Sequence, residues 1–168
     1  MDVLYYWKDS AADRKAGRIG YFKSAKDKLD EFQAGYPGFI WVVKTPSGMK
    51  GKLQLLARLV WSDTPKGLAR KSPGDSHIFY DVEHPRSVWF EEGDAEQAVE
   101  EVSTWMRLNF PAAVRGNFQG ANGQHALRGP MLSELEAIAA KLATRPFTGA
   151  ESRDPAHVTK SPPPASAP

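Results

Sequence analysis

The chain has 168 residues, of which 41% are hydrophobic and 25% are charged, as is typical of a soluble domain with a sizeable core. It has no cysteine, which excludes a disulfide framework, a thiolate metal site and a cysteine nucleophile. No apolar run approaches the roughly 18 residues of a membrane-spanning helix, and the start MDVLYYWKDS lacks the features of a secretory signal. We therefore expect a soluble, cytoplasmic protein.

The net charge of +2 hides an asymmetry between two parts of the chain. Residues 1–75 carry 14 Lys and Arg against 8 Asp and Glu, whereas residues 76–168 carry 8 against 12. A basic first half can attract a polyanion such as DNA or RNA. An excess of this size also occurs in domains where it serves only solubility.

The first half of the sequence predicts short strands with one helix among them. Runs of apolar and aromatic residues predict the strands 3–7, 19–22, 39–43, 52–61, 77–80 and 87–90. The polar segment 10–17 is expected to be a loop. Ser24 is the expected N-cap of a helix that ends before Gly35. The runs 39–43 and 52–61 form the best antiparallel pair, and the continuously apolar run 39–43 predicts a strand buried on both faces.

After Gly93 the pattern becomes helical. Asp94 is the expected N-cap, and a stripe at helical spacing is expected to be core: Ala95, Ala98, Val99, Val102, Trp105 and Met106. A last helix opens near Pro130 or Ser133 and stops before Pro146. The prediction is one α+β domain over residues 1–146, with helices packed over a small, strongly bent β-sheet or β-barrel. The Pro/Ala/Ser-rich segment 147–168 is expected to be a disordered tail.

The segment Val114–Pro130, VRGNFQGANGQHALRGP, lacks any apolar period and is rich in glycine and side-chain amides. Glycine lets a backbone approach a ligand closely, and an amide offers both a donor and an acceptor to the edge of a base. The same composition also fits a solvated connection whose amides cap neighbouring helices.

Aromatic residues on the predicted strands have cations close by in the sequence, a combination that suits base stacking and phosphate binding. Trp7 and Trp61 each end a strand next to a polar loop and are the expected stacking surfaces, whereas Trp41 is expected in the core. Most other rings are expected to fill the barrel. The expected base-edge contacts are Asn117, Gln119 and Asn122. The expected phosphate contacts are Lys8, Arg14, Arg115 and Arg128.

The sequence contains no P-loop, no G-x-G-x-x-G and no G-x-S-x-G motif. The four histidines show no metal-ligand spacing: His77, His84, His125 and His157. We therefore predict no catalytic residue, no metal ligand and no cofactor. Asp81 and Glu83 are similar to a nuclease carboxylate pair, but Pro85 stands where the accompanying lysine is expected.

The stretches LYYWKDS, GRIGYF, DEFQAGYPGFIWVVKTP and KLQLLARLVW, within residues 3–62, resemble the PUA superfamily and, more narrowly, EVE-like domains that read modified bases. The corresponding residues are Trp7, Gly35, the run 39–43 and Ala57 to Val60. The chain departs from the family in having Gly35-Tyr36 where a Gly-Asp pair is usual, and its amide-rich segment has no family counterpart. The resemblance implies a β-barrel-like fold with an aromatic pocket for a flipped or modified base, in RNA modification or in recognition of modified foreign DNA.

Three functions fit these features. The first is a non-enzymatic module that binds DNA or RNA and recognises a modified or flipped-out base, which requires the tryptophans and the amide segment to border one basic hollow. The second is a protein-interaction or regulatory subunit whose exposed aromatics dock a partner. The third is a small metal-dependent nuclease or toxin-like enzyme that uses Asp81, Glu83 and a histidine.

Overall fold

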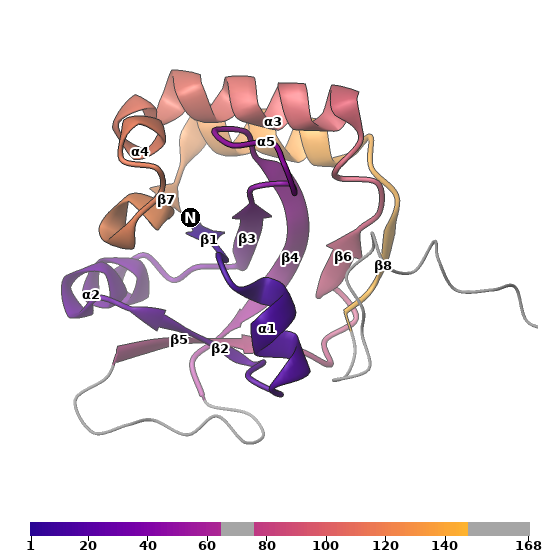
Figure 1. Cartoon of the computed structure of the whole chain (residues 1–168). Helices are drawn as coiled ribbons and strands as arrows, with labels where there is room; N and C mark the ends of the chain where they lie inside the picture. Colours follow the sequence, from indigo (N-terminus) through magenta and orange to yellow (C-terminus); the bar gives the residue numbers. More distant parts are fainter. Residues whose placement is uncertain (65–75, 148–168) are drawn as a thin grey trace, which may run out of the picture.

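The computed structural model describes residues 1–64 and 76–147, which form an α+β fold around one mixed sheet (Figure 1). The strand order is β2-β5-β4-β3-β1-β7, and β6 pairs with β4 and with β8. The strands are β1 Asp2–Tyr6, β2 Tyr21–Ser24, β3 Phe39–Lys44, β4 Gln54–Ser62, β5 Ser76–Asp81, β6 Val88–Phe90, β7 Gln124–Leu127 and β8 Thr144–Pro146. The helices are α1 Ser10–Lys15, α2 Lys26–Ala34, α3 Glu96–Asn109, α4 Pro111–Arg115 and α5 Gly129–Ala139, with a 3-10 turn at Gly120–Gly123.

Strand β3 contributes to two hydrophobic cores, one on each face of the sheet. Its sequence FIWVVK consists largely of β-branched and aromatic residues, which favour a strand. Successive side chains of a strand point to opposite faces. Accordingly Trp41 and Val43 join one core, and Ile40 and Val42 join the other. The predicted strand buried on both faces is confirmed, as is its antiparallel pairing with β4.

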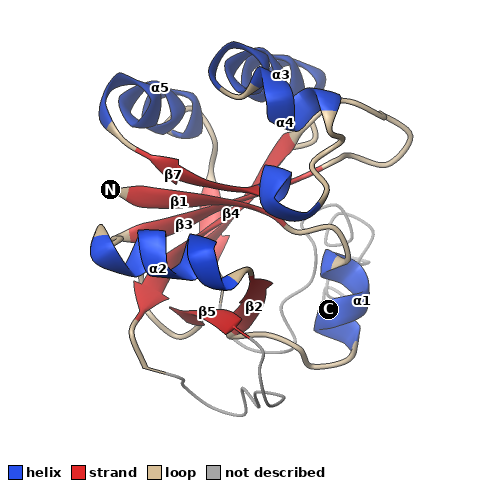
Figure 2. Cartoon of the chain, turned by 90° about the vertical axis from the view of Figure 1, so that its left-hand side faces the viewer, coloured by secondary structure: helices blue, strands red, loops and turns tan. Residues whose placement is uncertain are grey.

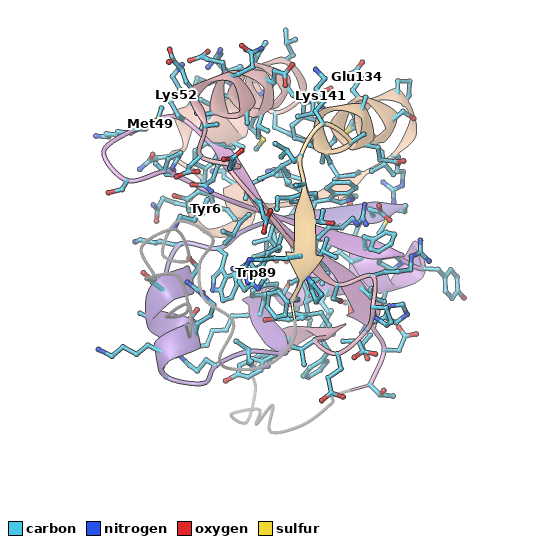
Figure 3. The ribbon with its side chains drawn as sticks, turned by 90° about the vertical axis from the view of Figure 1, so that its right-hand side faces the viewer. Tyr6, Met49, Lys52, Trp89, Glu134 and Lys141 are labelled. Carbon is cyan, nitrogen blue, oxygen red and sulfur yellow. The ribbon has the colours of Figure 1, made fainter. Side chains whose placement is uncertain are left out.

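Helices α3 and α5 cover one face of the sheet (Figure 2). The predicted stripe of α3 is buried from Ala98 to Met106, whereas Ala95 is exposed and lies outside the core. Two ion pairs hold α3 at its sides. Lys52, before β4, contacts Glu100, and Lys141, after α5, contacts Glu101, each with 2.6 Å between Nζ and Oε1 (Figure 3).

The second core lies on the other face, inside the curl of the sheet. Trp89 of β6 is fully buried there, beside β8 (Figure 3). The ring of Phe147 stacks on it with 4.3 Å between centroids. Phe147 itself is 0% exposed. The boundary that we expected before residue 147 therefore moves past Phe147, while residues 148–168 lie outside the described part of the chain.

The sheet curls into an open half-barrel, so the expectation of a strongly bent sheet is confirmed at this level. Strands β2 and β7 are the two ends of the strand order. The curl brings these two strands together. The Ser24 hydroxyl at the end of β2 donates a hydrogen bond to Oε1 of Gln124 at the start of β7, at 2.7 Å. We call the gap where β2 faces the paired strands β1 and β7 the seam. Helix α2 contacts both β5 and β7 and places Phe32 in the second core.

Several local predictions are wrong. Residues 10–15 form α1 rather than a loop, because a helix of fewer than two turns leaves no detectable apolar period. Ser24 does not cap α2, since its hydroxyl is used at the seam and Ala25 occupies the cap position. Ala95 likewise replaces Asp94 as the cap of α3. By contrast, helix α5 begins at Gly129, next to Pro130, which is one of the two predicted starts.

The amide-rich segment is more ordered than a connection. Its residues 124–127 form β7, which pairs antiparallel with β1 in the register Tyr5 with Gln124 and Asp2 with Leu127.

In residues 1–64 and 76–147, no helix combines the length and apolar character needed to cross a bilayer.

Candidate nucleic-acid interface

The seam contains a partly enclosed cleft with a volume of about 280 Å³. Its walls come from two stretches that are adjacent in sequence but not paired in the sheet. The lining residues are Tyr5, Tyr6, Trp7, Lys8, Asp9, Asp13, Arg18, Tyr21, Phe22 and Lys23. Because β1 pairs with β3 and β7, and β2 pairs with β5, side chains rather than ladder hydrogen bonds fill the space between β1 and β2.

Tyr5 bridges the two walls of the cleft. Its ring stacks on Phe22 with 4.3 Å between centroids and 14° between planes. Its hydroxyl donates to the Lys23 carbonyl at 2.9 Å. Burial, together with the negative charge of Asp13, raises the pKa of Tyr5 to about 12. The phenol is neutral at physiological pH, and the raised pKa extends the neutral form to more alkaline pH.

Asp13 on α1 organises the polar side of the cleft. One carboxylate oxygen accepts a hydrogen bond from Nε1 of Trp7 at 2.8 Å, and the other accepts from Nε of Arg18 at 3.0 Å. The Arg18 side chain is 54% exposed, so the carboxylate orients a cation that still faces solvent. Lys8 and Lys23 are also exposed at the cleft. The arrangement puts aromatic rings beside three cations.

Tyr21 of β2 is the aromatic residue of the cleft best placed for a ligand. It meets His77 edge to face with 5.5 Å between centroids, and the residue remains partly exposed. Tyr6 differs, because its ring stacks on Phe118 and its hydroxyl donates to Oγ1 of Thr45 at 2.9 Å.

The prediction that Trp7 stacks a base is wrong, because its indole is only 3% exposed. The ring lies parallel to Trp89 at 6.4 Å and meets Phe22 at 5.1 Å. The position of the backbone explains this burial. The backbone N–H of Trp7 donates to the Val43 carbonyl and so continues the pairing of β1 with β3. In this position the indole points into the second core.

The two predicted stacking residues also lie at opposite ends of β3. Trp7 N–H bonds to Val43 near its end, whereas Trp61 N–H bonds to the Gly38 carbonyl just before its start. Five residues of strand separate these points, roughly 16 Å, so the two indoles cannot enclose one base. Trp61 is half-buried, and its Nε1 donates to Oδ1 of Asp63 at 3.0 Å.

The predicted base-edge residues lie beside the cleft rather than in it. Asn117 and Gln119 are exposed, and the Asn122 amide packs against Gly116. The segment meets the cleft through Tyr6, since a Cβ on Gly123 would come within 3.1 Å of Cβ of Tyr6. None of the three amides is among the cleft's lining residues.

His125 holds the amide segment in place from β7. Its Nε2 hydrogen-bonds the Asn122 carbonyl at 2.7 Å, and its ring stacks on Phe110 at 4.4 Å. Burial lowers the pKa of His125, which favours a neutral ring that donates this bond from Nε2–H.

The four predicted phosphate contacts are dispersed. Only Lys8 lines the cleft. Arg14 lies over the Trp89 ring at 5.1 Å, and Arg115 is exposed at the last turn of α4. Nη2 of Arg128 contacts Sδ of Met1 at 3.2 Å, at the opposite end of β1 from Lys8. Arg18 and Lys23, which line the cleft, were not among the predicted phosphate contacts. Their positions on either side of the predicted strand 19–22 could have indicated them.

Of the two carboxylates of the nuclease hypothesis, that of Asp81 stabilises a turn. Oδ1 of Asp81 accepts a hydrogen bond from Glu83 N–H at 3.2 Å, and its carbonyl accepts from the Ser87 hydroxyl at 2.6 Å. Among the residues that the structure describes, no group of three or more His, Asp or Glu side chains is arranged to hold a metal ion.

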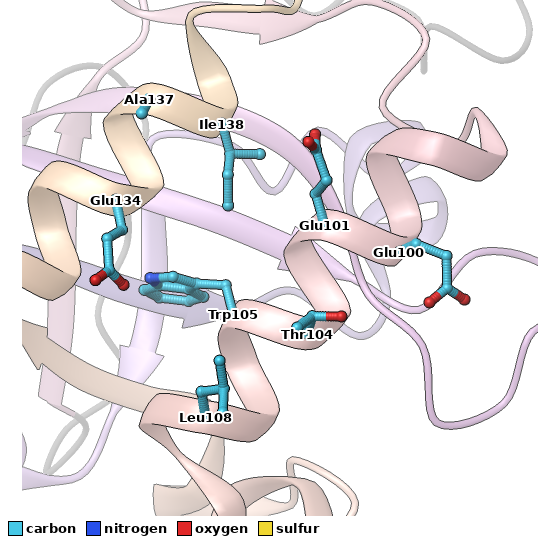
Figure 4. A pocket seen from close by; sticks show the side chains of 8 residues that line it. All are labelled: Glu100, Glu101, Thr104, Trp105, Leu108, Glu134, Ala137 and Ile138. Carbon is cyan, nitrogen blue, oxygen red and sulfur yellow. The ribbon is translucent and has the colours of Figure 1, made fainter.

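A second hollow, an apolar groove of about 470 Å³, lies between α3 and α5 (Figure 4). Trp105 and Ile138 project into it, and Trp105 is fixed by a hydrogen bond from Nε1 to the Met131 carbonyl at 2.9 Å. Leu108 at its end is 78% exposed. We call this the α3–α5 groove.

Comparison with known proteins adds no relative: no protein-family model, no curated protein and no solved structure matches this chain. Function is therefore inferred from the geometry of the seam cleft and of the other hollows.

Proposed function

We propose that this protein binds DNA or RNA and accepts one flipped-out or modified base in the seam cleft. The observation that carries the proposal is the combination, within one cleft of about 280 Å³, of aromatic walls with the cations Lys8, Arg18 and Lys23. A volume at the small end of ligand pockets suits a single planar ring system. The resemblance to base-reading PUA-like domains supports the same class of ligand.

Each part of the cleft has a role in this proposal. Tyr21 stacks the base, because every base has a flat face that an aromatic ring can cover. Arg18, oriented by Asp13, and Lys8 bind the flanking phosphates. The exposed carboxylate of Asp9 offers an acceptor to an amino group on the base edge. The amides Asn117 and Gln119, beside Tyr6, contact a neighbouring nucleotide.

Fluorescence anisotropy with short single-stranded DNA and RNA, with and without modified bases, tests the proposal. Stacking on an aromatic side chain contributes about 1–3 kcal/mol per base, so Tyr21→Ala should weaken binding by roughly tenfold or more. Arg18→Gln should weaken binding and also flatten its salt dependence. Lys50→Gln, an exposed cation in the turn before β4, is the matched control and should leave affinity unchanged.

Absence of binding to the whole panel at about 50 mM salt would refute the proposal, since phosphate contacts strengthen as salt is lowered. Equal affinity of the wild type and Tyr21→Ala would refute the placement of the base in the seam cleft.

A second candidate function, a protein-interaction subunit, is favoured by the apolar lining of the α3–α5 groove and the exposure of Leu108. Exposed apolar patches on a soluble protein often mark partner sites. This candidate predicts an association that is far less sensitive to salt than nucleic-acid binding and that is abolished by Leu108→Lys. Size-exclusion chromatography with light scattering, on the protein alone and with candidate partners, distinguishes it from nucleic-acid binding.

A further inference from the structure

A third hollow, of about 500 Å³, lies where α5 passes over the beginnings of β1 and β3. Its lining includes Tyr36, Phe39, Arg58, Arg86 and Glu136. We call it the arginine cavity. It also includes Met1 and Asp2, whereas the seam cleft includes Tyr5 to Lys8, so the two hollows lie at opposite ends of β1.

Two guanidinium groups share one aromatic ring in this cavity. Cζ of Arg58 lies 4.7 Å from the centroid of Phe39, and Cζ of Arg86 lies 4.9 Å from the same centroid. Arg58 also lies 5.5 Å from the centroid of Trp41, its cross-strand partner on β3. Arg86 comes from the turn between β5 and β6, so two separate parts of the fold converge on Phe39.

Among the described residues, no ion pair neutralises the positive charges of Arg58 and Arg86. No carboxylate in residues 1–64 or 76–147 lies within 4.0 Å of Arg58 or Arg86. Both oxygens of the nearby Asp2 are occupied: one accepts from Phe39 N–H at 3.0 Å, and the other accepts from Nε1 of Trp41 at 2.9 Å. Glu136, on the α5 side of the cavity, is exposed.

Arg58 is the more constrained of the two cations. Its Nε is buried and has no hydrogen-bond acceptor in the part of the chain that the structure describes. Burial and, next, the like charge of Arg86 lower the pKa of Arg58, while the negative charges of Asp2 and Glu136 partly oppose this shift. A buried donor without a partner is costly, and a second positive charge adds to that cost. An anion bound beside the two guanidinium groups would offset their mutual repulsion.

We propose that the arginine cavity binds the phosphate group of a nucleotide, with Arg58 and Arg86 as its two ligands. A guanidinium is a planar fork of donors whose geometry matches phosphate oxygens. A volume of about 500 Å³ exceeds what a phosphate ion requires, and the 89%-exposed Tyr36 supplies a ring for the rest of the nucleotide. This site rests on its own contacts and is independent of the seam cleft.

Isothermal titration with a 5′-mononucleotide, the matching nucleoside and inorganic phosphate tests this assignment. The mononucleotide should bind and the nucleoside should not. Arg86→Gln changes an exposed side chain and removes a hydrogen bond between two charged groups. The loss of such a bond should weaken mononucleotide binding by roughly 10-fold or more. Glu136→Gln removes the opposing carboxylate and should strengthen binding. Lys50→Gln is the neutral control.

The source of the phosphate is determined by comparing the binding of oligonucleotides with and without a 5′-phosphate. Binding that needs both the terminal phosphate and Arg86 identifies a strand end as the ligand. Binding of both forms that needs Arg86 identifies a backbone phosphate. Binding of free mononucleotide alone identifies a soluble nucleotide.

Equal affinity for nucleotide and nucleoside, or a mononucleotide affinity unchanged by Arg86→Gln, would overturn the assignment. Tyr21→Ala separates this proposal from the previous one, because it alters the seam cleft and should leave mononucleotide binding at the arginine cavity intact. Thermal unfolding of each variant without ligand checks that the fold is retained.

Discussion

At the scale of single residues, Asp13 connects the core to the candidate site. It accepts hydrogen bonds from the buried Trp7 indole and from the exposed Arg18 guanidinium. The sequence could not predict this role, because Asp13 lies in a polar segment that gave no sign of a helix. Nor could it predict that Trp7 faces inward, since a tryptophan at a strand end can point to either face.

Removal of the Asp13 carboxylate should destabilise the fold as well as the site. Asp13→Ala leaves the buried Nε1–H of Trp7 without an acceptor, which costs about 1–3 kcal/mol. Urea denaturation measures this loss. Asp9→Ala removes an exposed carboxylate that makes no cap hydrogen bond and is the matched control. Equal stability of the two variants would contradict the role given to Asp13.

The pKa of Tyr5 predicts an alkaline limit to stability. The pKa is about 12 in the fold, against about 10 in the unfolded chain, so between these values the unfolded chain loses its proton first. Tyr5 therefore has no effect on the pH dependence below pH about 10, and stability falls as pH rises from about 10 to 12. Tyr5→Phe should reduce this fall between urea midpoints measured at pH about 8 and 11. An unchanged fall would show that Tyr5 is not held protonated by the seam.

At the scale of elements, the sequence predicts what is long, apolar or strictly periodic. The pairing of β3 with β4 and the buried stripe of α3 are recognisable because each has several consecutive apolar signals. Strand β7 is not recognisable, because its four residues QHAL become a strand only by pairing with β1, more than a hundred residues away. The short helix α1 is missed for a related reason.

Gly93, just before α3, is required by close packing on β4. A Cβ at this position would overlap the carbonyl oxygen of Leu55. Gly93→Ala should therefore destabilise the protein by about 1–3 kcal/mol and loosen α3 against the sheet. Hydrogen exchange of the β4 amides and urea denaturation measure the two effects.

Gly48→Ala provides the contrast to Gly93→Ala. At Gly48, φ is 74° and no atom lies within 4 Å of an added Cβ, so backbone strain is the sole expected cost. Faster exchange of β4 amides in Gly93→Ala but not in Gly48→Ala supports close packing. The same exchange rates in both variants would contradict it.

At the scale of the whole molecule, the curl of the sheet creates the site. The seam exists because β2 and β7, the ends of the strand order, meet through Ser24 and Gln124 rather than through a backbone ladder. The sequence indicates a bent sheet but does not reveal which strands end next to each other. The amide segment, Trp7 and Trp61 were therefore expected in one hollow and are distributed around the molecule instead.

The interior of the half-barrel depends on Phe147, which lies far along the chain from the strands that it covers. Its ring is fully buried, stacked on Trp89 and edge to face with Tyr80 at 5.8 Å. Phe147→Ala should cost about 3–5 kcal/mol in the free energy of unfolding. Tyr36→Ala, at an 89%-exposed ring, should change it by about 0.5 kcal/mol or less. A loss of similar size in both variants, measured by urea denaturation, would contradict the packing described.

Backbone amide chemical-shift mapping during titration with a short single strand tests the seam cleft most directly. If a base binds in the seam cleft, the largest shifts fall on residues 5–9 and 18–23, on the two sides of the seam, and Tyr21→Ala greatly reduces them. Shifts confined to α3 and α5, or the absence of any shift at low salt, would contradict it.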